Sequence, residues 1–497
     1  MQWGITCAHA GNDLIDISDI TSSKSLMVAQ VLDLGHGSES GISTGSNIEK
    51  PVFVAMQDPV DQPEIIGIDT RPDTTPILVP DPVIEPKPGL ITTADNMNMI
   101  VAANDTAEDI GAPGSNINFD EEKDFGPLTL GPGYLEPGVE ETLRYDDNVT
   151  YSPTGTTQAF INILTPKLGY VIPGKKLKIK LDTELETGLY GSGSVDNYID
   201  FLFKSSVDYQ PTSRIYSQLT GDFTKSHDGR GTGRALGGLG TTQDSPDEWH
   251  RFDFGSTFAY GAATTKGRVE LEADYGIKRY DNNRTLTFVR DLDELGGAAR
   301  FFYRVRPKTY AVLEGRISEV NYQNDAPGLP SLDSLTTRQL LGVTWLATFK
   351  TSGFLKLGLI NKDFYSSRRT DNDGFTWEVG VDWKPKTYSI VRLKTDQSFE
   401  ETNGTGDAID TMTFSLNWEH GWRPRIKSIL DFIYTMEKYD PDPREDNIFN
   451  AGARVDYEFR RWLNLSAGYR FQQRSSSTDV FEYDQNIFEL TADFTFY

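Results

Sequence analysis

The sequence predicts an all-β protein: a transmembrane, antiparallel, up-and-down β-barrel of about 18 strands, preceded by a disordered N-terminal region. Three observations predict this fold. Apolar and polar residues alternate, segment after segment, from residue 138 to residue 497. The connections between these segments are alternately short and long, and the first 137 residues are acidic and rich in proline.

The composition excludes other kinds of membrane protein and several kinds of site. The chain has 497 residues and a formal net charge of -25, and it contains no run of about 20 apolar residues that could form a membrane-spanning helix. A barrel strand needs an apolar residue only at every second position, so a polar composition is compatible with a barrel. The lone cysteine, Cys7, excludes a disulfide framework and a Cys-based zinc site. We expect no metal and no other cofactor.

Residues 1–137 differ in character from the rest of the chain. They hold 22 acidic but only five basic residues, and 13 of the 25 prolines. Such a segment cannot bury enough apolar surface to offset the entropy lost on ordering, so we expect it to be disordered. We place it in the periplasm as a linker, with an arm that binds periplasmic export or assembly machinery as the alternative. The run Gly131-Pro132-Gly133-Tyr134 marks the boundary with a barrel over 138–497.

The first residues do not show the secretory signal that an outer-membrane protein requires. Residues 1–23 contain Asp13, Asp16 and Asp19 and no Lys or Arg. The apolar run at 25–30 is too short for the core of such a signal. This is the main observation against a membrane barrel.

The alternation within the predicted barrel is clearest in its last segment, which is also aromatic, as is typical of the closing strand of bacterial outer-membrane barrels. Successive side chains of a strand point to opposite faces, so one face here is apolar and the other is polar. The apolar face carries Phe488, Leu490, Ala492, Phe494 and Phe496. The same period of two fills 177–185, 268–278, 375–383, 453–460 and 463–472.

The lengths of the connections favour a membrane barrel over a soluble β-sandwich. Eight short turns, from 173–176 to 460–462, alternate with nine longer polar loops, from 147–157 to 473–483. A sandwich has no reason for this alternation, whereas outer-membrane barrels have short periplasmic turns and long outer loops. These seventeen connections join an even number of strands, with both ends on the short-turn side, and we expect strands of about 10 residues.

A barrel of this size has an aqueous interior, so the residues that face inward should set its selectivity. We expect most inward charges to pair across strands. The predicted exception is a cluster on two adjacent strands with only Glu314 opposing it nearby, and these arginines could guide an anionic polymer. The cluster consists of Arg300, Arg304, Arg306 and Arg316. Tyr216 and Phe302 share the inward parity and could stack on sugar rings, although each could equally fill space.

The start of the predicted barrel resembles a known family. The residues that carry the resemblance are Leu143-Arg144-Tyr145-Asp146-Asp147-Asn148-Val149, then Ser152-Pro153, then Leu164-Thr165-Pro166 with Leu168. This pattern resembles a family of outer-membrane β-barrel porins encoded with exopolysaccharide biosynthesis systems, and more distantly the alginate-exporter barrels. The resemblance covers 134–497, with Tyr145, Asp146, Asp147 and Asn148 as its motif; the terminal Tyr497 departs from it by falling off the apolar parity. It implies a passive exit from the outer membrane for a secreted polysaccharide, and the inward arginines indicate that this polymer is anionic.

The partners that follow from this interpretation are outer-membrane lipid, the polysaccharide and periplasmic machinery; we expect no nucleic-acid partner. A general or small-nutrient diffusion porin is the alternative function, because it needs the same wet interior. Asp146-Asp147-Asn148 could bind a divalent cation, but three residues fall far short of a calcium shell, and a turn is the preferred interpretation.

An outer-membrane hydrolase is a further alternative, and we expect no enzyme. Such barrels carry histidines at the outer rim, where only His227 and His250 are predicted to lie, near Asp228 and Asp247. No serine is matched to either histidine as a nucleophile would be.

Overall fold

The computed structural model describes residues 128–496, except 234–235, 263–264, 349 and 403–405, and it leaves undescribed the side chains of 346–348. The predicted disorder of 1–137 therefore falls almost wholly outside the described residues. The sheet begins at Leu128, ahead of the boundary expected at 138. No helix among the described residues is long and apolar enough to cross a membrane.

The described chain is almost entirely β-structure. Four short 3-10 turns and one four-residue helix, α3 (Arg284–Thr287), lie in the loops. The strands are β1 (Leu128–Leu130), β2 (Gly133–Asp146), β3 (Ala159–Ile172), β4 (Leu177–Tyr190), β5 (Tyr198–Thr212), β6 (Ile215–Asp228), β7 (Asp247–Tyr260), β8 (Gly267–Tyr280), β9 (Leu292–Arg306), β10 (Thr309–Tyr322), β11 (Ser334–Thr348), β12 (Thr351–Phe364), β13 (Asn372–Lys386), β14 (Ser389–Glu401), β15 (Ala408–Arg423), β16 (Ile426–Asp440), β17 (Glu445–Arg460), β18 (Leu463–Ser476) and β19 (Tyr483–Thr495).

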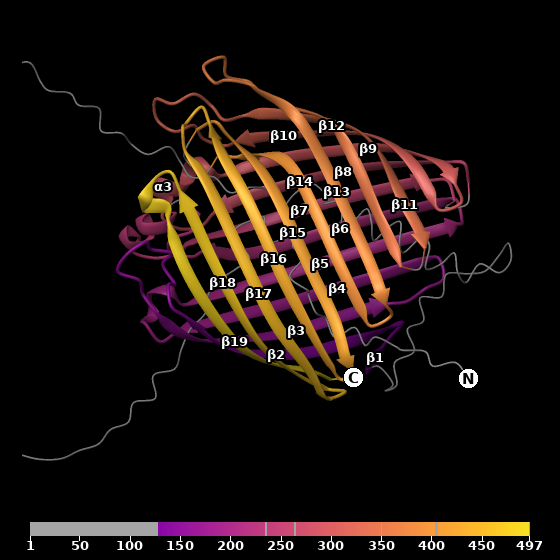
Figure 1. The fold of residues 1–497 in the computed structure, drawn as a ribbon, viewed down its shortest axis with the longest axis horizontal. Coiled ribbons are helices and arrows are strands. Elements are labelled where there is room, and N and C mark those ends of the chain that lie inside the picture. The colour runs from indigo at the N-terminus through magenta and orange to yellow at the C-terminus, as the bar shows by residue number, and fades with distance from the viewer. Residues whose placement is uncertain (1–127, 234–235, 263–264, 349, 403–405, 497) are drawn as a thin grey trace, which may run out of the picture. The chain divides into compact units, whose positions relative to one another are not determined.

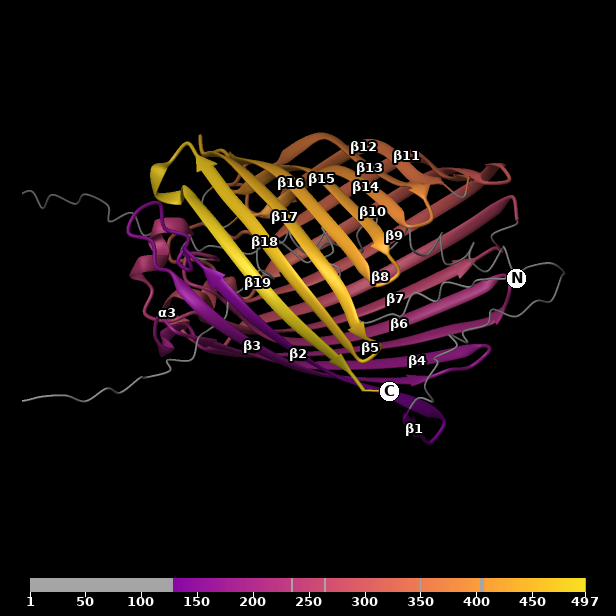
Figure 2. The same ribbon diagram turned by 60° about the horizontal axis from the view of Figure 1, so that its bottom comes forward.

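The sheet closes on itself, as the sequence predicted. Each strand from β2 onward pairs antiparallel with the next, and β19 returns to pair with β2, from Ile487 opposite Asp146 to Thr495 opposite Gly138. Strands β2–β19 thus form one closed barrel of eighteen strands, and Figures 1 and 2 show the yellow C-terminal strands lying beside the indigo β2 and β3. A single closed sheet excludes the sandwich.

The extra strand, β1, forms a hairpin with β2. Gly131 and Pro132 make the turn, and Gly131 has a φ of 60°, which a residue with a side chain rarely adopts. One edge of β2 is taken by β3 along its whole length, so β1 must pair with the same edge as β19. Because β19 stops opposite Gly138 and β1 pairs with 133–135, β1 continues the line of β19 and covers the edge that β19 leaves open.

The connections follow the predicted alternation, but the strands are longer than expected. Strands β2–β19 have 13–16 residues rather than about 10. Since about ten tilted residues cross the hydrocarbon layer, the remaining residues extend beyond it and shorten the loops. The predicted long loop 438–447, for example, shrinks to 441–444 because β16 and β17 reach Asp440 and Glu445.

The outer face of the barrel is apolar, and the inner face carries the buried polar side chains. Outward side chains such as Leu341 and Leu490 are 66% and 60% exposed. Exposed tryptophans stand near the short turns at Trp383, Trp422 and Trp462, in the position of an aromatic girdle. This inside-out distribution suits a wall with lipid outside and water inside.

One ionisable side chain interrupts the outward apolar band. Glu141 shares the outward face of β2 with Val139 and Leu143, and it accepts a hydrogen bond from Asn162 Nδ2 of β3. Its other neighbour, on β19, is Ala492. Outward charges elsewhere in the described strands, such as Asp293 and Glu319, lie near strand ends.

Candidate functional site: the inner wall of the barrel

The inner wall is lined with charged residues because the polar positions of each alternating strand all face inward. On β9 and β10, Glu294, Arg300, Glu314 and Arg316 are each buried, while Leu295 and Leu313, at alternate positions, are exposed on the outer face. Antiparallel pairing brings inward residues of adjacent strands within reach of one another. The wall can therefore neutralise itself through ion pairs.

Glu314 is the centre of the largest group of ion pairs. Its Oε1 accepts from Arg300 Nε at 2.7 Å and from Arg316 Nε at 2.5 Å, and its Oε2 accepts from Lys356 Nζ at 2.7 Å. None of these four side chains is more than 8% exposed. A carboxylate with three cationic donors has little acceptor capacity left for a ligand.

The group extends to the strands on both sides. Glu378 of β13 accepts from Arg316 Nη1 at 2.6 Å, from Arg338 Nη1 at 2.7 Å and from Lys356 Nζ at 3.4 Å. On the other side, Arg300 also binds Glu272 of β8. We call these seven residues the ion-pair lattice. It comprises Glu272, Arg300, Glu314, Arg316, Arg338, Lys356 and Glu378, and it ties β8 through β13 together.

Inward-facing glycines make room for the lattice. Gly342 and Gly358 lie on the inner face between Arg316 and Glu378. A Cβ at Gly358 would lie 1.8 Å from the carbonyl oxygen of Gln339, so no side chain fits there. Long side chains can therefore reach across β11 and β12.

The structure divides the four arginines that the sequence grouped together. Arg300 and Arg316 are engaged in the lattice, so the expectation that only Glu314 opposes them was wrong: Glu272 and Glu378 do so too. Parity places Glu272 inward on the neighbouring strand β8, but it could not show Glu378, which comes from a strand three positions away from β10. Arg304 and Arg306 lie instead at the turn end of β9, where neither forms an ion pair with another described residue.

The two candidate stacking residues face inward but lie apart. Tyr216 of β6 donates its hydroxyl to Asp208 Oδ1 at 2.7 Å, and Phe302 of β9 is 4% exposed. Two strands, β7 and β8, separate them. They do not form one stacking surface.

The family-motif residues hold the seam where the barrel closes. Tyr145 faces outward and contacts Phe160, with ring centroids 4.9 Å apart. Asp146 accepts from the Asn148 backbone N–H at 2.8 Å and from Gln485 Nε2 of β19 at 2.8 Å. Asn148 in turn donates to the carbonyl oxygen of Asp484 at 2.9 Å. The motif thus joins the end of β2 to the start of β19.

Asp147 completes this arrangement from the opposite side of the strand. Its carboxylate accepts from the backbone N–H and from Nδ2 of Asn486, both at 2.7 Å. Asp146 and Asp147 therefore point to opposite sides and bind different residues of β19. Two carboxylates placed in this way do not share one cation, which supports the turn interpretation.

The two rim histidines each bind an aspartate. His227 Nδ1 lies 3.0 Å from Asp200 Oδ1 and His250 Nδ1 lies 2.8 Å from Asp281 Oδ1. Neither imidazole has a hydrogen bond with a serine hydroxyl among the described residues.

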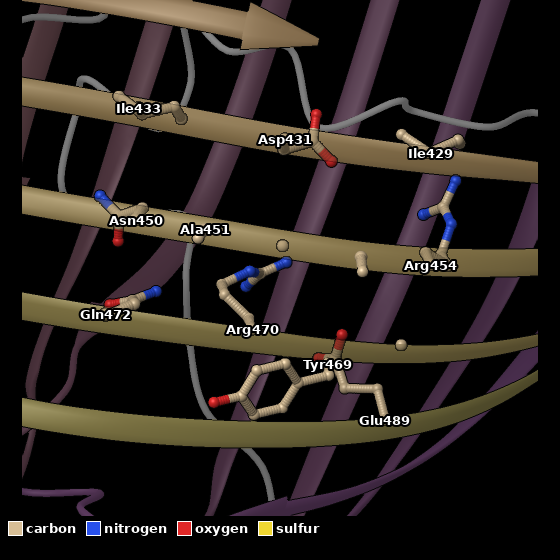
Figure 3. A pocket seen from close by; sticks show the side chains of 13 residues that line it. Ile429, Asp431, Ile433, Asn450, Ala451, Arg454, Tyr469, Arg470, Gln472 and Glu489 are labelled. Carbon is tan, nitrogen blue, oxygen red and sulfur yellow. The ribbon is translucent and has the colours of Figure 1, made fainter. Parts of the chain in front are cut away.

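A hollow in the inner wall, over β16–β19, is the site that the sequence did not reveal. Its cavity volume is about 70 Å³, and two inward glycines, Gly452 and Gly468, form its floor. Figure 3 shows Arg470 reaching across it toward the strand that carries Ala451, with Asp431 and Glu489 on either side. The parity of 463–472 already placed Arg470 inward, but only the register shows that glycines lie beside it.

Three of the four charges around this hollow are engaged elsewhere. Glu489 accepts from Arg144 Nη2 at 2.6 Å, and Arg454 Nε lies 2.9 Å from Asp456 Oδ1. Asp431 accepts from Asn417 Nδ2 at 2.7 Å. Arg470 forms no ion pair or hydrogen bond with any residue that the structure describes.

Comparison with known proteins identifies a family. Residues 128–496 match the model of the family described as "Putative beta-barrel porin 2". No curated protein matches the chain. Solved structures that resemble it include the siderophore receptor PirA from Acinetobacter baumannii, at 8% identity and a TM-score of 0.40, covering 73% of this chain and 80% of that one. OccAB3 from Acinetobacter baumannii, at 12% identity and a TM-score of 0.40, covers 73% of this chain and 99% of that one.

Proposed function

This chain belongs to the family described as "Putative beta-barrel porin 2", and we propose that its barrel is a passive outer-membrane exit channel for a secreted, anionic exopolysaccharide. The family and the fold show that the protein is a β-barrel porin of the bacterial outer membrane. The direction of transport and the polymer are the proposed part. A channel of this kind carries out no reaction and needs no cofactor.

The observation that carries the proposal is the position of the unengaged arginines on a wall whose other charges mostly pair. Arg304 and Arg306 stand at the turn end of the barrel, and Arg470 stands midway along β18. Guanidinium groups fork onto carboxylates, so such residues would attract a polyuronate at the entrance and again inside. Conduction needs sites that are weak and several, and spaced arginines meet that need better than one tight cluster.

The lattice has a different role in this proposal. Its arginines already bind glutamates, so they offer a passing polymer little free hydrogen-bonding capacity. Its four cations exceed its three glutamates by a single charge, so the lattice repels neither sign strongly. The lattice would keep the wall rigid and wet while the unengaged arginines interact with the polymer.

The proposal places residues 1–127 in the periplasm. Leu128 enters the sheet at the short-turn end, and short turns face the periplasm in outer-membrane barrels. Protease added to intact cells should leave this segment uncut, whereas protease added after the outer membrane is permeabilised should remove it. Cutting in intact cells would reverse the orientation.

The export proposal is tested by deletion and complementation. Loss of the gene should lower secreted polysaccharide and retain polymer or its fragments in the periplasm. Complementation with the double variant Arg304→Glu, Arg306→Glu should restore the folded barrel but not full secretion, because the entrance would now repel an anion. A deletion strain with normal extracellular polysaccharide but poor uptake of a small nutrient would favour the diffusion-porin alternative.

A further inference from the structure

We propose that Arg470 and the hollow over Gly452 and Gly468 form a binding subsite for a single carboxylate, such as that of a uronate residue. This deepens the proposed function and rests on it for the identity of the natural ligand. The subsite itself is argued from the wall alone. It lies on β16–β19, whereas the ion-pair lattice lies on β8–β13.

The register explains why a hollow exists here. Asp431, Gly452 and Arg470 stand directly opposite one another on β16, β17 and β18. One row away, Arg454 and Glu489 stand on either side of Gly468. Gly452 and Gly468 therefore lie diagonally across from each other, and each has a charged residue on either side. Neighbouring strands are about 4.8 Å apart. The missing side chains leave a gap between Asp431 and Arg470.

The gap is open at Gly452. A Cβ built there would meet nothing closer than 3.8 Å, which is ordinary contact with the Asp431 side chain. The glycine is thus not required by a close backbone approach, unlike Gly358 in the lattice. Its effect is to leave space in front of Arg470.

The charges around the hollow select an anion. Asp431, Arg454 and Glu489 each have a partner outside it, so the Arg470 guanidinium is the cation at the hollow whose N–H groups have no described partner. A guanidinium presents parallel N–H groups that match the two oxygens of a carboxylate. The hollow has room for such a group, since a water molecule needs only about 10–15 Å³ by the same measure.

The same neighbours restrict the ligand and weaken its binding. Asp431 and Glu489 flank Arg470 and repel negative charge, which disfavours a doubly charged phosphate more than a singly charged carboxylate. Ile429 and Ile433 border the hollow and offer an apolar surface for the carbon face of a sugar ring. A weak, single-carboxylate subsite is what a polymer needs if each unit is to leave as readily as it enters.

The test is channel block in planar bilayers by an oligogalacturonate of about ten units, with a neutral dextran of similar length as the reference probe. The wild-type channel should show longer block by the oligogalacturonate. Arg470→Gln should shorten the residence time about tenfold, the effect of losing a charged hydrogen bond. Arg470→Lys should give an intermediate time, because an ammonium keeps the charge but not the fork.

Two further variants separate the subsite from general electrostatics and from misfolding. Gly452→Thr fills the hollow and keeps every charge, so it should shorten the residence time as Arg470→Gln does. Lys438→Gln removes the same charge from the outward face of β16 and should leave the residence time unchanged. If Gly452→Thr and Arg470→Gln both leave the residence time of the oligogalacturonate unchanged, the proposed subsite is overturned. If Arg470→Gln does not fold, the result with Gly452→Thr decides alone.

The outcomes for subsite and export are separable. An Arg470-dependent block in a channel whose deletion leaves secretion normal would keep the subsite and overturn export. Loss of secretion on deletion, together with block that ignores Arg470, would keep export and overturn the subsite.

Discussion

Glu314 illustrates how one residue can stabilise a wall built from six strands. Glu314→Gln would leave Arg300, Arg316 and Lys356 without a shared counter-charge in a buried site. Removing one partner of a buried ion pair typically costs about 3–5 kcal/mol, and the other glutamates of the lattice should reduce this to the lower end. We expect a lower urea midpoint for the barrel in liposomes.

Glu458→Gln is the matched control for that variant. Glu458 faces the same interior from β17, and its side chain has no ion pair among the residues that the structure covers. Its substitution should change the midpoint little. Equal effects of the two substitutions would contradict a special role for the lattice.

Glu141 and Asn162 lead to a prediction of opposite signs on the lipid face. Glu141→Leu should stabilise the barrel by about 1–2 kcal/mol, because a carboxyl group in the apolar band is replaced by an apolar side chain. Asn162→Leu should destabilise it, because Glu141 then loses its hydrogen-bond donor. Urea unfolding in liposomes measures both, and stabilisation by Asn162→Leu would show that the pair contributes nothing.

At the scale of the residue, the sequence predicted which side chains face the interior of the barrel but not which of them form ion pairs. The parity rule placed Arg300, Tyr216 and Phe302 on the inner face, where the structure has them. Whether an arginine is engaged depends on residues several strands away, such as Glu378, and on which intervening positions are glycine. The ion pairs that an arginine forms depend on strand register and side-chain length. The alternation of apolar and polar residues reveals neither of these.

At the scale of the element, the seam between β2 and β19 depends on a loop rather than on strand pairing alone. Asn148, which is 1% exposed, donates to the carbonyl oxygens of Ser152 and Asp484. Asn148→Ala would leave both acceptors without this donor and should destabilise the barrel by about 1–3 kcal/mol. We expect a smaller folded fraction, measured as the faster-migrating band on an unboiled gel.

Asn464→Ala provides the comparison at the other end of the barrel. Asn464 lies on β18 beside a short turn and makes no side-chain hydrogen bond to a described residue. Its substitution should leave the folded fraction unchanged. A loss as large as that of Asn148→Ala would show general sensitivity to asparagine replacement instead of a role for the seam.

The sequence predicted the elements and their order but not their lengths. The structure confirms three predictions: a strand in the last segment, the alternation of short and long connections, and the even number of barrel strands. The ends of strands such as β16 and β17 were missed because polar residues continue the pairing beyond the membrane, where period-two hydrophobicity no longer marks a strand.

At the scale of the whole molecule, the closed sheet predicts a protease-resistant core. Limited proteolysis in detergent should leave a fragment that begins no later than Leu128, since β1 is paired from that residue onward. The fragment should remain heat-modifiable, migrating faster before boiling than after. Mass spectrometry of its N-terminus gives the boundary. A stable fragment that begins after Gly133 would show that β1 is not stably paired with β2.

The position of β1 also has a consequence for anyone who labels this protein. A peptide fused to the C-terminus would extend the line of β19, where β1 already pairs with 133–135 of β2, so the two would compete for that edge. A C-terminal affinity tag or fluorescent fusion is thus a poor reporter of how well the native chain assembles. An epitope inserted between Asp325 and Gly328, in an exposed part of the loop after β10, avoids that competition and would display the label at the opposite opening.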